Sequence, residues 1–213
     1  MLKLIPNILT FGRLVLTIIF LIMILYSPRF YAEGERPFPD FLDLAFILFV
    51  VAGLTDMVDG AIARRLNVVS KFGRMIDPLA DKVFVCGAFI CFAIIGEPKL
   101  FNLTETPLAV IHWAVAAILV SREAYVTVLR HIAEARGVNF AATISGKVKM
   151  CVQTFVIGTV IIKMAHVQTA EWGHWFTTIV FILMLTITVV SGIRATQRSC
   201  WKQAAKAGDS TSV

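Results

Sequence analysis

The chain has 213 residues, of which 58% are hydrophobic and 16% are charged; its formal net charge is +6 and its mean hydropathy is +0.80. Soluble domains usually carry about 25% charged and about 45–50% apolar residues. One soluble core cannot hide this apolar excess, so the composition excludes an ordinary cytosolic enzyme, a disordered chain and a secreted disulfide scaffold. An all-α, polytopic membrane protein is expected.

Six segments are long and apolar enough to cross a membrane, which takes about 20 mostly apolar residues. They cover approximately residues 8–26, 40–62, 77–97, 108–130, 148–167 and 173–193. We expect a single six-helix membrane domain over residues 1–200 and a polar tail over residues 201–213. The third helix is expected to begin near Asp77, because Pro78 is best tolerated in the first turn of a helix.

The basic residues between these segments predict the orientation of the chain. Cytoplasmic connections of membrane proteins carry an excess of Lys and Arg. With the N-terminus inside, the outer connections hold Arg29, Arg36, Lys99 and Lys163. The inner segments then hold Lys3, Arg64, Arg65, Lys71, Arg74, Arg130, Arg136, Lys147, Lys149, Arg194, Arg198, Lys202 and Lys206. Both termini are therefore predicted to be cytoplasmic.

Four aspartates stand where the second predicted helix ends and the third begins. Asp56 and Asp59 are three residues apart, and Asp77 and Asp81 are four apart, so each pair shares one helix face. The predicted topology brings both pairs to the cytoplasmic boundary, where four like charges repel unless they are protonated or bridged by cations. Carboxylate oxygens suit Mg²⁺ and Mn²⁺, so the spacing predicts a site for a divalent metal ion.

Small residues accompany the acids, at Gly60, Ala63 and Gly73. Missing side chains let a phosphate approach the backbone, but they also let two helices pack closely. The residues alone leave both interpretations open.

The whole pattern is Asp56-x2-Asp59-Gly60-x2-Ala63-Arg64-x8-Gly73-x3-Asp77-x3-Asp81, and it resembles the signature of the CDP-alcohol phosphotransferase family at every position. The motif covers 26 residues, and the six-helix architecture of that family fits the whole chain. The resemblance implies a membrane enzyme in which an alcohol attacks the β-phosphorus of a CDP-linked lipid and CMP leaves.

The resemblance also implies roles for these residues. Two Mg²⁺ or Mn²⁺ ions would be held by Asp56, Asp59, Asp77 and Asp81, and Asp81 would be the catalytic base that takes the alcohol proton. The CDP-lipid would contact Asp56, Asp59, Gly60, Ala63, Arg64, Gly73 and Asp77.

A phosphorylated acceptor would need cations near the acids, and the candidates are Arg122, Arg130, Lys147 and Lys149. Arg122 lies in an apolar segment, where a buried arginine pairs with another group. Because Glu123 is not expected to share its face, the partner is predicted to be a ligand phosphate or an aspartate of the motif. An interhelical ion pair stays open for Arg122, and inner-surface charges stay open for the other three.

Shorter motifs favour one acceptor. Ile5-Pro-Asn-Ile-Leu-Thr10-x2-Arg13, Arg122-Glu123-x6-Arg130 and Gly146-Lys147-x-Lys149 are similar to those of bacterial family members that use glycerol 3-phosphate. Met150 and Cys151 depart from this pattern, in which a threonine is expected. The resemblance implies CDP-diacylglycerol, glycerol 3-phosphate and membrane lipid as partners, and a homodimer. No nucleic acid partner is expected. A bacterial inner membrane is expected, and the predicted topology places the active site at its cytoplasmic face.

Arg13 stands inside the first predicted helix. It is expected either to snorkel to the lipid headgroups or to help hold the lipid phosphate.

Two other functions fit parts of the pattern. The same chemistry with phosphatidylglycerol as acceptor would give cardiolipin, and inositol phosphate is a further possible acceptor. A cation transporter would use the four aspartates as an ion site.

Overall fold

The computed structural model describes residues 5–28, 39–66, 71–100, 103–135, 144–167 and 170–209. Within these ranges it describes the backbone alone at 5–10, 39–40, 56–66, 71–78, 134, 144–145, 147 and 198–209. Six helices account for most of the described chain: α1 (Ile5–Tyr26), α2 (Pro39–Leu66), α3 (Lys71–Ile95), α4 (Glu105–Ala135), α5 (Ile144–His166) and α6 (Glu171–Asp209). The predicted all-helical fold is confirmed.

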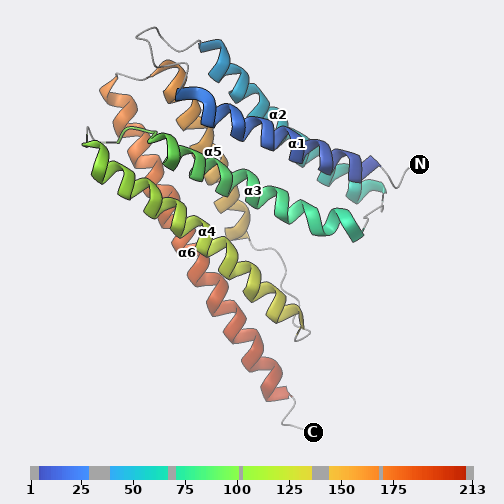
Figure 1. Ribbon diagram of the computed structural model, residues 1–213. Helices are drawn as coiled ribbons and strands as arrows, with labels where there is room; N and C mark the ends of the chain where they lie inside the picture. The colour runs from blue at the N-terminus through green and yellow to red at the C-terminus, as the bar shows by residue number, and fades with distance from the viewer. Residues whose placement is uncertain are drawn as a thin grey trace.

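The helices run up and down, each antiparallel to the one before it (Figure 1). The C-terminal end of α2 and the N-terminal end of α3 therefore lie at the same end of the bundle. α1 packs against both α2 and α3, while α5 packs against α2 and α6, and α4 against α3 and α6. α1 thus joins the two helices that carry the acidic motif.

Three helices are long and apolar enough to cross a membrane among the residues described: Glu105–Ala133, Val148–His166 and Glu171–Gln197. The described parts of α1 and α2 contribute shorter apolar stretches, Phe11–Tyr26 and Phe41–Thr55. The fold is thus that of a helical bundle with several candidate membrane spans. Six spans with cytoplasmic termini stay a prediction.

Three phenylalanine rings, one from each of the first three helices, pack against one another and hold α1, α2 and α3 together. Phe20 of α1, Phe49 of α2 and Phe84 of α3 lie with their ring centroids 5.4–5.7 Å apart in all three pairs. Phe20 is fully buried and Phe49 nearly so. Aromatic pairs at this spacing stabilise a fold by about 0.5–1.5 kcal/mol beyond their buried area. The rings therefore fix α1, α2 and α3 relative to one another.

Two helix ends differ from the prediction by more than five residues, the start of α3 and the end of α6. α3 begins at Lys71, so Pro78 is its eighth residue and the expected start near Asp77 is wrong. Proline removes one backbone hydrogen bond, and such a gap is tolerated in membrane helices when neighbouring groups satisfy the freed carbonyl.

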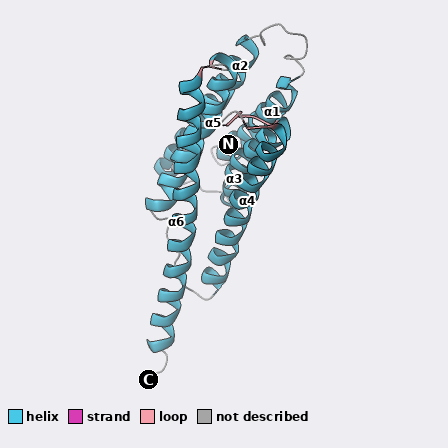
Figure 2. Cartoon of the chain, turned by 90° about the vertical axis from the view of Figure 1, so that its left-hand side faces the viewer, coloured by secondary structure: helices cyan, strands magenta, loops and turns pink. Residues whose placement is uncertain are grey.

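The sixth helix is also longer than its apolar segment. α6 continues through the predicted polar tail to Asp209, and both views show its C-terminal end projecting beyond α4 (Figures 1 and 2). Lys and Gln in this segment favour helix although they are polar, and Ala favours it although it is only weakly hydrophobic, so hydropathy alone underestimates the length of the helix.

Candidate functional site

The aspartates of the motif are placed by two helices. Asp56 and Asp59 lie near the C-terminal end of α2, and Asp77 and Asp81 lie in the N-terminal half of α3. Each pair shares one helix, as predicted, and the two helix ends lie at one end of the bundle (Figure 1).

Asp81 is the motif residue whose side chain can be followed in detail. The other signature residues are described by their backbone alone, and they are Asp56, Asp59, Gly60, Ala63, Arg64, Gly73 and Asp77. The side chain of Lys147 also lies outside the described ones. Their predicted roles stay predictions.

Asp81 forms an ion pair with Arg13 of α1. The guanidinium Nη1 of Arg13 donates to the carboxylate Oδ1 of Asp81 over 3.1 Å. Arg13 is buried, with 5% of its surface exposed, whereas the Asp81 side chain is 32% exposed. This burial argues against the expected snorkelling of Arg13 out to the surrounding lipid, since its guanidinium is enclosed by the protein and paired with Asp81. A role at the lipid phosphate stays a prediction.

An apolar cavity of about 460 Å³ adjoins this ion pair. It lies between α1, α2, α3 and α5, on the side of the motif toward the phenylalanine rings. Its polar lining comes from Arg13, Thr17, Asp81 and Thr154. The rest of its lining is apolar or small: Phe49, Val50, Ala52, Gly53, Leu54, Ala80, Phe84, Val85, Met150 and Cys151. On α2 the lining reaches Leu54, two residues before Asp56, and on α3 it includes Asp81 itself, so the cavity adjoins the acidic motif on both helices.

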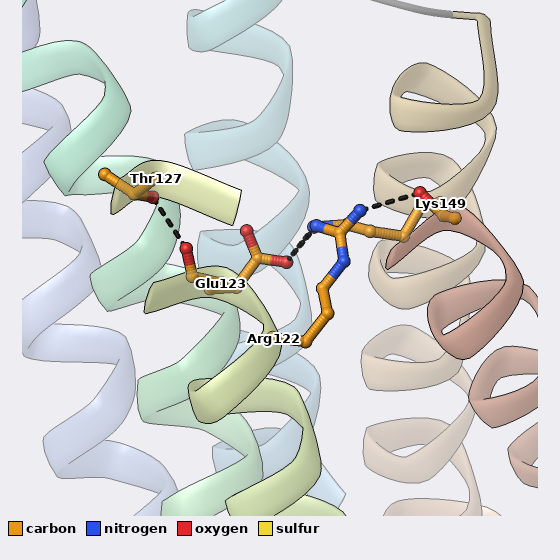
Figure 3. A network of polar contacts seen from close by, with 5 residues as sticks. Arg122, Glu123, Thr127 and Lys149 are labelled. Atoms are coloured by element: carbon orange, nitrogen blue, oxygen red, sulfur yellow. Dashed lines mark hydrogen bonds and ion pairs between the residues drawn. The ribbon is translucent and has the colours of Figure 1, made fainter. Parts of the chain in front are cut away.

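A second polar cluster joins α4, α5 and α6 (Figure 3). Arg122 Nη1 donates to Glu123 Oε1 over 2.9 Å, and the ammonium of Lys149 contacts the same carboxylate oxygen. Arg122 Nη2 donates to the hydroxyl of Ser191 over 2.6 Å. The side chains of Arg122, Glu123 and Lys149 are 12%, 15% and 6% exposed, so the charges are paired inside the bundle. We call these four residues the α4–α6 cluster.

Glu123 is the described ionic partner of Arg122, which the sequence did not predict. The expectation that Arg122 pairs with a motif aspartate rather than with Glu123 is wrong, because the long arginine side chain spans the angle between consecutive residues of a helix. The backbone carbonyl of Glu123 also accepts from the Thr127 hydroxyl over 2.6 Å (Figure 3). Its position beside Arg122 was the signal that could have found it. Ser191 gave no signal of its own.

Of the cations predicted to bind the acceptor phosphate, the structure brings Arg122 and Lys149 together. Arg122 and Lys149 both pair with Glu123. The Arg122 pair lies within α4 and is not the interhelical ion pair that the sequence left open for Arg122, whereas the Lys149 pair joins α5 to α4. Arg130 lies exposed on α4, eight residues after Arg122. The cluster thus supplies two cations and one anion, with a net charge of +1.

The chemistry of the donor set fits a hard divalent cation. The motif offers four carboxylates and neither histidine nor cysteine, and carboxylate oxygens favour Mg²⁺ and Mn²⁺ over softer metals. Among the side chains that the structure describes, no group of three or more possible metal ligands occurs. The fit therefore rests on the motif, with Asp81 as its described member.

The sequence matches the family model of CDP-alcohol phosphatidyltransferases over residues 3–193. It is 32% identical over 190 residues to the CDP-diacylglycerol--glycerol-3-phosphate 3-phosphatidyltransferase of Bacillus subtilis (strain 168), covering 88% of this chain and 90% of that protein. It is 29% identical over 194 residues to the Escherichia coli (strain K12) protein of the same name, covering 90% and 95%.

A third relative comes from Mycobacterium tuberculosis (strain ATCC 25618 / H37Rv) and is named probable phosphatidylglycerophosphate synthase. It is 29% identical over 187 residues, which cover 88% of this chain and 77% of that protein. The family match extends far beyond the acidic motif and covers α1 to α5 and the part of α6 up to residue 193. The chain belongs to the CDP-alcohol phosphatidyltransferase family.

Proposed function

We propose that this protein transfers the phosphatidyl group of CDP-diacylglycerol to glycerol 3-phosphate, giving phosphatidylglycerophosphate and CMP. The observation that carries the proposal is the place of Asp81, a signature acid of the family, at the polar boundary of an apolar cavity. The names of the curated relatives support the same donor and acceptor. Family membership favours this transferase over the cation transporter that the aspartates alone would permit.

The donor lipid is expected to lie with part of its apolar tail in the cavity. A volume of about 460 Å³ falls within the range of about 300–1,000 Å³ that is usual for ligand cavities. The apolar lining removes hydrocarbon from water, while Arg13 and Asp81 mark the level of the headgroup. The diphosphate then reaches the part of α2 and α3 that carries the motif.

The chain's own residues account for the transfer step. Asp81 is proposed to accept the proton of the acceptor hydroxyl while that oxygen attacks the β-phosphorus of the CDP-lipid. The phosphorus–oxygen bond to CMP breaks, and CMP leaves with the bonding electrons. A positioned base contributes about 10²–10⁴-fold to such a rate.

Asp56, Asp59 and Asp77, with Asp81, are the residues proposed to hold Mg²⁺ or Mn²⁺, two ions by the family resemblance. When bound, the metal would neutralise the charge of the diphosphate and of the leaving CMP. Gly60, Ala63, Arg64 and Gly73 are proposed to contact the cytidine diphosphate portion.

Arg122 and Lys149 are proposed to bind the phosphate of the acceptor, with Arg130 and Lys147 as further cations at the same end of the bundle. Arginine suits this task because its planar guanidinium donates to two phosphate oxygens at once. Phosphatidylglycerol would make weaker use of these cations, so the cluster favours glycerol 3-phosphate.

The site is proposed to lie at the cytoplasmic face of a bacterial inner membrane, in a bundle of six spans with both termini inside. The antiparallel course of consecutive helices supports this topology (Figure 1). The homodimer that the family resemblance implies stays a prediction.

The test of the acceptor is a competition. Purified protein in vesicles that contain CDP-diacylglycerol and phosphatidylglycerol would be offered glycerol 3-phosphate and inositol phosphate together, with Mg²⁺ or Mn²⁺. Mass spectrometry of the lipids should show phosphatidylglycerophosphate as the main product. Cardiolipin or phosphatidylinositol phosphate as the main product would keep the chemistry and overturn the acceptor.

A further inference from the structure

We propose that Arg13 is a positioning residue of the transfer site, whose guanidinium holds the carboxylate of Asp81 in a fixed orientation. The inference rests on the proposed function. It adds α1, which carries no part of the acidic motif, to the elements that build the site.

Arg13 is itself held in place. It is 5% exposed, and Thr17, one turn further along α1, is 1% exposed and lines the same cavity. Phe20 follows within another turn and packs against Phe49 of α2 and Phe84 of α3. Because α1 packs against both of these helices, the guanidinium enters the site from an element fixed on two sides.

Asp81 needs such a partner more than a core residue does. Its side chain is 32% exposed and borders a cavity, so packing restrains it less. The terminal torsion of an aspartate is broad, and an unsupported carboxylate samples many orientations. A catalytic group must be held within about 0.5 Å of its productive position, which requires a supporting contact. The 3.1 Å contact from Arg13 Nη1 supplies one.

The charge of Arg13 also supports a fixed contact with Asp81. A buried cation inside a membrane helix is costly unless it is paired, and α1 places Arg13 beside Asp81 of α3. Phe84, one turn after Asp81, belongs to the ring cluster that contains Phe20. The ion pair and the rings thus join α1 to α3 at two successive levels. Displacing Arg13 would therefore change the orientation of Asp81 before it changed the packing of the helices.

The competing role for Arg13 is direct binding of the lipid phosphate, and kinetics separates the two. A positioning residue acts on the rate of the chemical step, so its loss lowers kcat. A residue that binds the donor equally in the ground and transition states acts on the KM for CDP-diacylglycerol.

The experiment compares Arg13→Gln and Arg13→Lys with the wild-type protein in CMP release. We expect Arg13→Gln to lower kcat about 100-fold, as misplacement of a reacting group by about 1 Å does, with the KM of each substrate changed little. Arg13→Lys keeps the charge and should recover much of kcat, because the observed contact uses a single nitrogen. Arg194→Gln, at an exposed arginine of α6, is the matched control and should behave as wild type.

A second readout does not depend on activity. Thermal unfolding of Arg13→Gln, Asp81→Asn and the double variant, without metal or substrate, forms a double-mutant cycle. If the pair exists in solution, the unfolding temperature of the double variant should fall by less than the sum of the falls in the two single variants. Additive effects would overturn the pairing.

The kinetic outcomes are equally decisive. A rise in the KM for CDP-diacylglycerol at constant kcat, or full activity of Arg13→Gln, would overturn the positioning role. A wild-type protein that releases no CMP with any acceptor would instead overturn the proposed function, and the unfolding cycle would still test the ion pair.

Discussion

Among the side chains that the structure describes, two ionic groups differ in how their acid is enclosed: Arg13 with Asp81, and the α4–α6 cluster around Glu123. Asp81 has a described contact with one arginine, is 32% exposed and borders a cavity of about 460 Å³. Glu123 lies between Arg122 and Lys149, is 15% exposed, and belongs to a cluster that Ser191 extends to α6.

The Asp81 carboxylate is accessible to a ligand from the cavity, whereas the Glu123 carboxylate is paired with cations of the protein itself. A carboxylate at a cavity is accessible to substrate, and its removal should affect chemistry first. A carboxylate between two buried cations offsets part of their charge, and its removal should affect stability first. The two clusters therefore predict opposite responses to the same change, from acid to amide.

The largest effect is expected from Asp81→Asn. The amide cannot accept the hydroxyl proton, so kcat should fall about 10³-fold, within the range usual for a positioned base. Steady-state CMP release measures this effect, and thermal unfolding checks that the fold is intact. Asp43→Asn is the matched control, since Asp43 is 44% exposed in the side chain and pairs with His166 away from the motif. Retention of more than about a tenth of the activity in Asp81→Asn would contradict a role as base.

Glu123→Gln should instead lower the stability of the empty protein. It leaves Arg122 and Lys149 facing each other without a counter-charge, and breaking a buried pair in this way costs about 3–5 kcal/mol. If the two cations bind the acceptor phosphate, glycerol 3-phosphate should raise the unfolding temperature of the variant more than that of the wild type.

Differential scanning fluorimetry with and without glycerol 3-phosphate measures this response. Glu105→Gln, in the first turn of the same helix, serves as control. An equal ligand-induced shift in variant and wild type would mean that the α4–α6 cluster is structural and that the acceptor binds elsewhere.

The smallest effect is expected at the cavity. A Cβ atom built on Gly53 meets no described atom within 4 Å, so Gly53→Leu can extend into the cavity without displacing the helices. We expect the KM for CDP-diacylglycerol to rise about tenfold, equivalent to about 1.4 kcal/mol of binding free energy, while the KM for glycerol 3-phosphate stays constant.

Gly12→Leu is the matched control for this change. Gly12 has the same open surroundings but does not line the cavity. Unchanged kinetics of Gly53→Leu, or a rise in both KM values, would show that the lipid does not use the cavity.

Much of the fold follows from the sequence because the length of each apolar segment indicates a helix directly. The six helices of the described chain and their antiparallel course can be predicted in this way. The ends of the helices cannot, since Lys71 and Asp209 lie in polar segments where propensity, rather than hydropathy, decides. Pro78 does not mark the start of α3, because the helix extends back to Lys71.

Part of the candidate site can likewise be predicted from the sequence and part cannot. The spacing of Asp56, Asp59, Asp77 and Asp81 identifies the motif within two helices. The contact of Arg13 with Asp81 joins residues 68 positions apart, and that of Arg122 with Ser191 joins residues 69 apart. Such contacts depend on how each helix is rotated about its axis, which a local pattern does not determine.

The most direct test of the central claim is CMP release by the purified protein with CDP-diacylglycerol and Mg²⁺ or Mn²⁺, with and without glycerol 3-phosphate. The account predicts release that requires the acceptor and stops when a chelator removes the metal. Release without any acceptor, or with glycerol 3-phosphate in the presence of excess chelator, would contradict a metal-dependent phosphatidyl transfer at this motif.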